Sequence, residues 1–122
     1  GGTLGLLVDI NVVRNKGIFV DFFGVPACTT FIAAKLALRT GAAMVPVFAP
    51  WEDRRQRFVV DIGKPLAIER SGDEKEDIRQ LTSSFTKIVE DNVRRYPDQW
   101  LWTHKRWRTG RVGEQNLYES DE

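Results

Sequence analysis

The alternation of strand-like and helix-like segments in the first half of the chain most constrains the fold. Residues 18–23 are β-branched and aromatic and lie between two glycines, a pattern typical of a strand. Residues 27–40 are rich in Ala and Leu, follow a proline and end before a glycine, which predicts a helix. Residues 43–49 are apolar without alternation, which indicates a strand buried on both faces. Strand, helix and strand in this order favour a parallel crossover.

Further segments complete this expectation. Residues 5–9 form a short apolar run that ends in a carboxylate, and residues 57–62 alternate, so we expect a strand from the first and a half-exposed strand from the second. The polar turn at residues 52–55 suits an antiparallel connection from residues 43–49. Pro46 places that strand beside an edge or at a bulge, because proline cannot donate to a sheet ladder. The sequence therefore predicts an α/β fold, a mixed sheet with helices packed on it.

A second long helix is predicted from residue 71 onward. The run Ser71-Gly72-Asp73-Glu74 matches a capping box, in which Ser71 caps the first turn and Glu74 reaches back to it. Apolar residues then follow helical spacing until Pro97 ends the helix. The stripe consists of Ile78, Leu81, Phe85, Ile88 and Val89.

The composition is that of one small globular domain and excludes several classes of protein. The 122 residues are 42% hydrophobic and carry a net charge of +1. A single cysteine, Cys28, and a single histidine, His104, cannot form an internal disulfide or a thiolate and imidazole zinc cage. The longest apolar run contains two prolines and is far shorter than the roughly 20 residues of a membrane-spanning helix. Common nucleotide-binding, nucleophile-elbow and metalloprotease motifs are absent from the sequence, so we expect no cofactor and no metal.

The first candidate site lies where the expected strand 5–9 meets the loop 10–16. A carboxylate ends the strand, cations follow in the loop, and two threonines stand in the first turn of the predicted helix. Helix N-termini attract anions such as phosphate because their N–H groups are unpaired. The candidate substrate-binding residues are Asp9, Asn11, Arg14, Lys16, Thr29 and Thr30. The alternative is that the threonines satisfy only local backbone groups and that Asp9 pairs with Arg14 or Lys16.

The second candidate region, residues 94–111, is rich in tryptophan and cations. It carries six basic residues, one acidic residue and three of the four tryptophans. Tryptophan beside Lys or Arg suits a membrane surface with anionic head groups, and it also suits stacking on nucleic acid. The candidate membrane or head-group contacts are Trp100, Trp102, Lys105, Arg106 and Arg108. The alternative is that the tryptophans pack under the sheet while the cations face water.

Short blocks occur in a distinctive order along the chain. They are Asp9-Ile10-Asn11, Gly17 to Gly24, Ala27 to Thr30, Val45 to Phe48 and Pro97 to Thr109. In this order they resemble the C-terminal part of the late (lauroyl/myristoyl) lipid A biosynthesis acyltransferases, a family within the lysophospholipid acyltransferase superfamily. Ile10 departs from the Gln that the family usually has there, so it does not supply that side chain's hydrogen bonds.

The resemblance implies an acyltransferase at the cytoplasmic face of a bacterial inner membrane. Such an enzyme moves a fatty acyl chain from acyl carrier protein to a hydroxyl of a lipid A precursor, and nucleic acid is not expected as a partner. The family uses a His-x-x-x-x-Asp/Glu motif to make the hydroxyl nucleophilic. In this chain the fifth residue after His104 is Thr109, not an acid.

The resemblance also implies that the catalytic pair lies upstream. The chain has no initiator methionine at its start, so we expect a fragment, inactive alone and without a catalytic residue. Arg14, with Lys16 behind it, would contact phosphates of the substrates. Residues 1–111 would be the C-terminal part of an acyltransferase domain of the glycerol-phosphate acyltransferase type, and residues 112–122 an acidic, mobile tail. The rival is a noncatalytic domain that binds anionic lipid or nucleic acid through residues 94–111.

Overall fold

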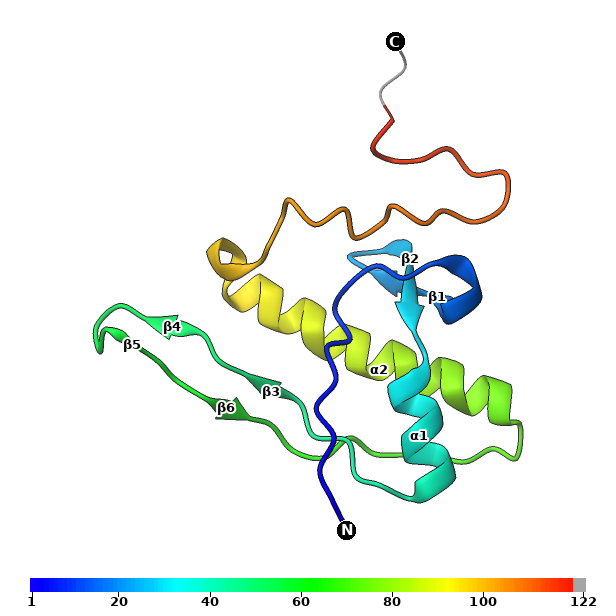
Figure 1. Ribbon diagram of the computed structural model, residues 1–122, viewed down its shortest axis with the longest axis horizontal. Coiled ribbons are helices and arrows are strands. Elements are labelled where there is room, and N and C mark those ends of the chain that lie inside the picture. The colour runs from blue at the N-terminus through cyan, green and yellow to red at the C-terminus, as the bar shows by residue number, and fades with distance from the viewer. Residues whose placement is uncertain (120–122) are drawn as a thin grey trace.

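The computed structural model describes residues 1–119 of the chain. Within this range it contains two α-helices, two short 3-10 helices and three two-stranded antiparallel sheets, so the expected mixture of helices and strands is confirmed. Figure 1 shows helix α2 crossing the molecule beside α1 and the β1–β2 hairpin, with the other strands extended to one side. The elements are η1 (Arg14–Lys16), β1 (Gly17–Phe22), β2 (Val25–Thr30), α1 (Ile32–Thr40), β3 (Val47–Phe48), β4 (Trp51–Glu52), β5 (Arg57–Phe58), β6 (Asp61–Ile62), α2 (Glu74–Arg95) and η2 (Pro97–Gln99).

The strands β1 and β2 form a tight hairpin. Phe22 pairs with Val25, which leaves a turn of two residues, Phe23 and Gly24. Both turn residues have a positive φ, 54° and 76°, as a type I′ turn requires. This turn type matches the twist of the flanking strands, so the two strands pair along their whole length.

The helix predicted over residues 27–40 begins later than expected, because its first residues belong to the hairpin. The first four of these residues belong to β2, and α1 begins only at Ile32. Pro26, expected to open the helix, lies in a two-stranded sheet, where an edge position tolerates its missing N–H. The predicted end is confirmed, because Gly41 caps α1 with a φ of 73°.

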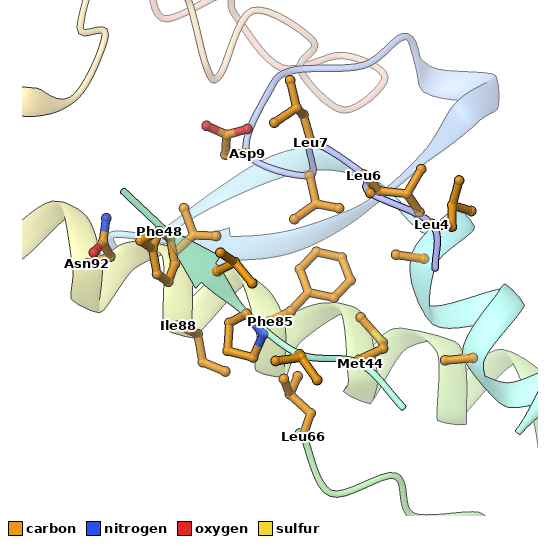
Figure 2. A pocket seen from close by; sticks show the side chains of 18 of the residues that line it. Leu4, Leu6, Leu7, Asp9, Met44, Phe48, Leu66, Phe85, Ile88 and Asn92 are labelled. Atoms are coloured by element: carbon orange, nitrogen blue, oxygen red, sulfur yellow. The ribbon is translucent and has the colours of Figure 1, made fainter. Parts of the chain in front are cut away.

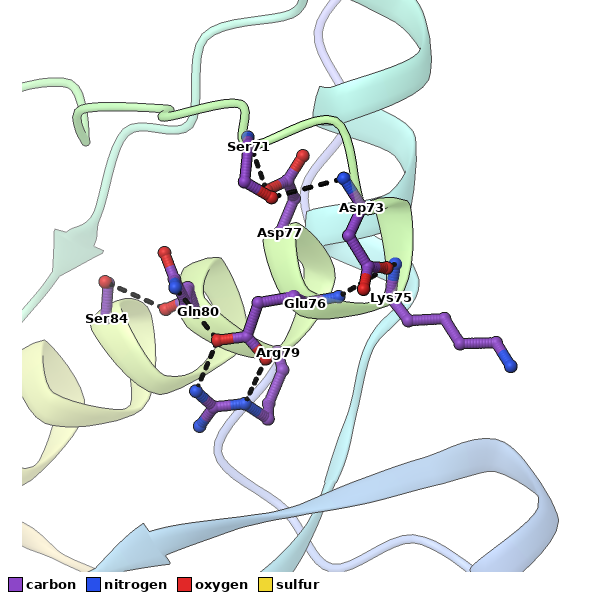
Figure 3. Close-up of polar contacts among 8 residues, drawn as sticks. All are labelled: Ser71, Asp73, Lys75, Glu76, Asp77, Arg79, Gln80 and Ser84. Carbon is purple, nitrogen blue, oxygen red and sulfur yellow. Dashed lines mark hydrogen bonds and ion pairs between the residues drawn. The ribbon is translucent and has the colours of Figure 1, made fainter.

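Helix α2 begins with a different cap from the predicted one (Figure 3). The N-cap is Asp73, whose carboxylate accepts the N–H groups of Lys75 and Glu76 at 3.0 and 3.3 Å. Ser71 precedes the helix and donates its N–H and hydroxyl to the Asp77 carboxylate at 2.8 and 2.7 Å. The cap predicted at Ser71 is therefore wrong by two residues, because Asp73 is an equally good capping residue nearer the helix.

The predicted apolar stripe of α2 is confirmed and forms the centre of the core. Leu81, Phe85 and Val89 are buried, and Ile78 and Ile88 are partly buried. One part of the stripe packs with α1 and another part packs with the β1–β2 hairpin. Helix α2 therefore fixes the hairpin, and with it the loop that enters β1.

A buried carboxylate also ties the hairpin turn to α2. Glu90 is only 6% exposed and accepts the N–H of Phe23 at 2.8 Å. Lys87 and Arg94 donate to the same carboxylate at 2.9 and 3.0 Å. Burial raises the pKa of Glu90, but the bonds from these three donors outweigh it and lower the pKa to about 2. The carboxylate is therefore ionised at neutral pH, and its bond with the Phe23 N–H ties the turn to α2.

The ribbon (residues 47–62) carries the remaining strands and departs from the predicted sheet. Strand β3 pairs with β6, and β4 pairs with β5, both antiparallel, so the described chain forms neither the single mixed sheet nor the parallel crossover that we expected. The antiparallel connection at residues 52–55 is confirmed. Residues 5–9 form no strand, because none of the described strands pairs with them.

Burial along the ribbon also differs from the expectation. Exposure alternates along residues 43–49. Val45 and Val47 are 42% and 57% exposed, whereas Met44, Pro46 and Phe48 are half-buried. In residues 57–62 the apolar face of Phe58, Val60 and Ile62 lies in solvent. A two-stranded ribbon offers no second layer to cover its outer face, so the apolar side chains on that face stay exposed.

The C-terminal arm (residues 100–111) passes over the β1–β2 hairpin (Figure 1). The rings of Trp100 and Trp107 pack against Phe22, with centroid distances of 5.8 and 5.6 Å. Beyond the arm, the Tyr118 hydroxyl accepts the backbone N–H of Trp107 at 3.2 Å. These contacts hold the arm against the hairpin.

The tail predicted over residues 112–122 falls only partly within the described chain, because residues 120–122 lie outside it. None of the helices in residues 1–119 is both long and apolar enough to cross a membrane.

Candidate functional site

Asn11 joins the loop before β1 to the C-terminal arm. Its backbone N–H donates to His104 Nε2 at 2.8 Å. Its side-chain amide donates to Thr109 Oγ1 at 3.0 Å, and its Oδ1 accepts the Thr109 N–H at 3.2 Å. The structure thus brings together two of the sequence blocks that resembled the acyltransferase family, although about 95 residues separate them.

The two cations of the loop are exposed. Arg14 donates from its guanidinium to the Gly110 carbonyl at 2.7 Å, which adds a further bond between loop and arm. Neither Arg14 nor Lys16 forms an ion pair with Asp9 among the described residues, so the pairing weighed as the alternative is not observed. Both cations are accessible to a ligand.

Thr29 and Thr30 end strand β2 and do not lie in the first turn of a helix. Thr29 is completely buried, and its hydroxyl accepts a bond from Arg106 at 2.5 Å. The Thr30 hydroxyl accepts the N–H of Ile32 at 3.4 Å. The expectation that these threonines mark an anion site at a helix N-terminus is therefore wrong, because the chain continues as a strand through both residues.

Arg106 is the buried cation of the C-terminal arm. It is 1% exposed and donates to the Cys28 carbonyl at 3.1 Å and to the Thr29 hydroxyl. Burial lowers the pKa of Arg106 to about 10, although the charge of Asp9 acts in the opposite direction. The guanidinium therefore stays charged at neutral pH. Its burial corrects the expectation that Arg106 contacts lipid head groups, because acceptors on β2 take up two of its nitrogens instead.

The other predicted membrane contacts differ in exposure. Trp100 is half-buried against the hairpin, which agrees with the alternative in which tryptophans pack. Trp102 is 55% exposed, and its neighbour Leu101 is 71% exposed. Lys105 and Arg108 are exposed as well. The outer side of the arm therefore combines apolar and cationic side chains.

A large apolar pocket lies between residues 2–9, helix α1, residues 42–50 and helix α2, and has a volume of about 1090 Å³. Figure 2 shows leucines of the N-terminal segment on one side of it, and side chains of α2 and of the segments around the ribbon on the other. Its apolar lining includes Leu4, Leu6, Leu7, Met44, Phe48, Leu66, Phe85 and Ile88. Asp9 and Asn92 contribute polar groups toward one end of it (Figure 2).

No pattern in the sequence predicted this pocket. Two of its walls come from the apolar runs 5–9 and 43–49, each of which we interpreted as a strand. The available signal was that each run lacks a polar face, so each needs cover on both sides. The sequence alone did not show which segments cover these runs, because that depends on contacts between distant parts of the chain.

The residues gathered here can bind a ligand with an apolar and an anionic part. The pocket supplies apolar surface, and Asp9 connects it to the loop with Arg14 and Lys16. His104 accepts a backbone N–H through Nε2. Within residues 1–119, no three His, Cys, Asp or Glu side chains group in a way that could hold a metal ion.

An apolar pocket with a few polar groups at its edge is typical of proteins that bind small amphiphilic molecules. The chain belongs to the bacterial lipid A biosynthesis acyltransferase family, whose model matches residues 1–109. It is 43% identical over 116 residues to the lipid A biosynthesis palmitoleoyltransferase of Escherichia coli K12, a match that covers 90% of this chain and 35% of the relative.

Two further relatives are less similar to the chain, and one of them is named for a lipid other than lipid A. The chain is 32% identical over 102 residues to the phosphatidylinositol mannoside acyltransferase of Mycobacterium tuberculosis, covering 84% of this chain and 30% of the relative. It is also similar to a lipid A biosynthesis acyltransferase of Haemophilus influenzae, with 25% identity over 113 residues. The chain spans about a third of the length of these curated relatives.

Proposed function

We propose that this chain is part of an enzyme that moves a fatty acyl chain from acyl carrier protein to a hydroxyl of a lipid A precursor. The reaction takes place at the cytoplasmic face of the bacterial inner membrane. The family and the names of its relatives support acyl transfer in the synthesis of lipid A or a related glycolipid. The sequence has no His-x-x-x-x-Asp/Glu motif, so we assign the proton-abstracting pair to a part of the enzyme outside these 122 residues.

The observation that carries this proposal is the apolar pocket. Its volume of about 1090 Å³ slightly exceeds the range of about 300–1,000 Å³ for small-molecule sites. Leucine, methionine and phenylalanine side chains line it, and such a lining favours a hydrocarbon chain through the apolar area removed from water. We assign the fatty acyl chain to this pocket.

The loop beside the pocket is assigned to the charged part of the substrates. Asp9 lines the pocket, while Arg14 and Lys16 lie exposed further along the same loop. Arginine presents a planar fork of donors that suits phosphate oxygens. Arg14 and Lys16 are therefore proposed to bind phosphates of the lipid acceptor or of the donor's phosphopantetheine, with Asp9 helping to position them.

The outer side of the C-terminal arm is assigned to the membrane surface. Leu101 and Trp102 expose apolar area, and Lys105 and Arg108 lie beside them in the sequence. Aromatic side chains prefer the level of the lipid head groups, and cations near anionic lipids contribute about 1 kcal/mol each. Whole-enzyme partitioning onto anionic vesicles tests this assignment.

Binding of a fluorescent fatty acid to the 122-residue chain tests the pocket. Leu7 lines the pocket and is 83% exposed, and Val112, outside it, is exposed to the same extent. We expect Leu7→Asp to weaken binding by about tenfold or more, because the carboxylate would have to lose water beside the hydrocarbon, and Val112→Asp to leave it unchanged. Equal binding by both variants would exclude the pocket as the acyl site.

A further inference from the structure

The contact between His104 and Asn11 belongs to a latch that joins the substrate loop to the C-terminal arm. We define the latch as Asn11 and Arg14 on the loop, and His104, Thr109 and Gly110 on the arm. Four hydrogen bonds connect them, with lengths between 2.7 and 3.2 Å. The latch closes a chain separation of more than 90 residues, so it fixes two segments that local sequence does not bring together.

The direction of the His104 bond defines what this side chain does. Nε2 accepts the Asn11 N–H at 2.8 Å, so this ring nitrogen carries no proton while the bond lasts. A nitrogen engaged in this way is not free to take a proton from a substrate hydroxyl. The only imidazole of the chain therefore acts by holding a backbone group.

The Asn11 side chain is occupied in the same way. Its amide nitrogen and oxygen form a reciprocal pair with the hydroxyl and N–H of Thr109. With its backbone N–H on His104, Asn11 has its side chain and its backbone donor bound within the protein. It therefore acts on a substrate through the loop that it fixes and not through direct contact.

The arm is anchored to the hairpin directly after His104, through Arg106 and Trp107. Arg106 is buried against β2 with two bonds from its guanidinium, and its guanidinium lies 5.2 Å from the Phe22 ring. Trp107 packs on Phe22 and donates its Nε1 to the Val25 carbonyl at 3.4 Å. The packing of Arg106 and Trp107 therefore fixes the position of His104, and the bond from the Asn11 N–H to His104 fixes the position of Asn11.

We propose that His104 is a positioning residue, which holds the loop of Asp9, Asn11 and Arg14 in register with the pocket through the Asn11 backbone. This inference rests on the proposed function of that loop in substrate binding. A held loop offers its Arg14 fork to a phosphate without first losing conformational freedom, and such preorganisation improves affinity. His104 should therefore affect substrate affinity more than the rate of the chemical step.

The test compares His104→Leu with His104→Gln in the full-length enzyme that contains this chain. Leucine removes the acceptor, while the Gln amide oxygen can accept the same N–H. We expect His104→Leu to raise KM for the lipid acceptor by about five- to tenfold with kcat within about twofold, as for the loss of one neutral hydrogen bond. His104→Gln should restore most of the affinity. A fall in kcat at unchanged KM, or equal losses in both variants, would overturn the proposal.

Amide hydrogen exchange of Asn11 in the 122-residue chain gives a readout that is independent of acyl transfer. The Asn11 amide should exchange at least about tenfold faster in His104→Leu than in the wild type, and near the wild-type rate in His104→Gln. An unchanged rate in His104→Leu refutes the latch whatever the enzyme does. A further outcome is that the Asn11 amide loses protection in His104→Leu while Arg14→Ala leaves the enzyme fully active. That result would support the latch but refute the role of the loop in substrate binding, and with it the positioning role of His104 in this reaction.

Discussion

The guanidinium of Arg106 lies 5.2 Å from the centre of the Phe22 ring and is almost completely enclosed by the hairpin and the C-terminal arm. This contact puts a charged side chain of the arm at the place where an aromatic side chain of β1 enters the core. Two of its nitrogens are bound by β2, and its Nε has no hydrogen-bond partner in the described structure. Packing and charge at Arg106 therefore add to the contacts of Trp100 and Trp107 that hold the arm on the hairpin.

We predict that Arg106→Ala destabilises the chain strongly. The change opens a cavity beside Phe22 and removes one hydrogen bond each from the buried Thr29 hydroxyl and the Cys28 carbonyl. A loss of about 2–4 kcal/mol in the free energy of unfolding is expected, measured by urea denaturation. The matched control is Arg108→Ala, an exposed arginine two residues further on, which should change stability by less than about 0.5 kcal/mol. Similar effects of the two substitutions would contradict the burial of Arg106.

Gly17 is predicted to tolerate no side chain. A Cβ atom there would lie 2.5 Å from Val12 Cγ2 and 2.7 Å from Cys28 Sγ, and 2.9 Å from the backbone oxygen of Thr29. Gly17→Ala should therefore cost about 1–3 kcal/mol in thermal or urea unfolding through overpacking. Gly5→Ala is the control, because a Cβ at Gly5 meets no atom within 4 Å. Equal stability of the two variants would show that the loop before β1 is not packed as described.

The N-cap of α2 gives a further prediction. Asp73→Ala removes the acceptor of two N–H groups and should lower the free energy of unfolding by about 0.5–2 kcal/mol. Asp73→Asn keeps a capping oxygen and should stay near the wild type. Circular dichroism during urea unfolding measures both. A loss as large in Asp73→Asn as in Asp73→Ala would show that the cap is not what stabilises this end.

The sequence predicted elements that local rules determine. The stripe of α2 and the glycine stop of α1 follow from spacing and from one backbone conformation, and both are confirmed. Thr29 and Thr30 were misplaced because Pro26 and the small residues after it fit a helix start, whereas pairing with β1 gives six residues of ladder instead. Tertiary pairing overrode local propensity at this point.

Burial was the least predictable property of the candidate site. Arg106 and Arg108 are both cations two positions apart in one block, yet only Arg106 is buried. Which of them turns inward depends on acceptors on β2, more than 75 residues away in the chain. The contact of Asn11 with His104 has the same origin. The loop was found from its polar residues, but its partner depended on long-range packing.

The pH dependence of stability should show a contribution from Glu90. Burial acts to raise its pKa, but its three donors lower the pKa to about 2 from the ordinary value of 4.5. A carboxyl whose pKa is lower in the folded state stabilises the fold above about pH 4.5, and this contribution is lost as the pH falls toward 2.

Glu90→Gln should therefore cost about 1–3 kcal/mol at pH 7 and less as the pH falls toward 2, in urea titrations across that range. Glu69→Gln, at an exposed acid, is the control and should change the free energy of unfolding by less than about 0.5 kcal/mol. A pH-independent difference between wild type and Glu90→Gln would show that the charge of Glu90 does not hold the turn.

Removal of the Arg14 charge is predicted to lower the affinity for substrate. It is exposed on η1 and proposed to bind phosphate, so Arg14→Ala in the full-length enzyme should reduce kcat/KM by about 10- to 100-fold, as expected for a charged hydrogen bond. Arg54→Ala, at an exposed arginine on the ribbon and away from the pocket, should leave kcat/KM unchanged.

Arg14 also donates to the Gly110 carbonyl, so its two roles have to be separated. Arg14→Gln keeps a donor for that carbonyl but carries no charge, whereas Arg14→Lys keeps the charge on a single nitrogen. If phosphate binding dominates, Arg14→Lys should retain more of the kcat/KM than Arg14→Gln, and the difference should shrink as ionic strength rises, since salt screens an exposed charge pair. The reverse order, with Arg14→Gln near the wild type, would make Arg14 part of the latch only and would remove it from the substrate site.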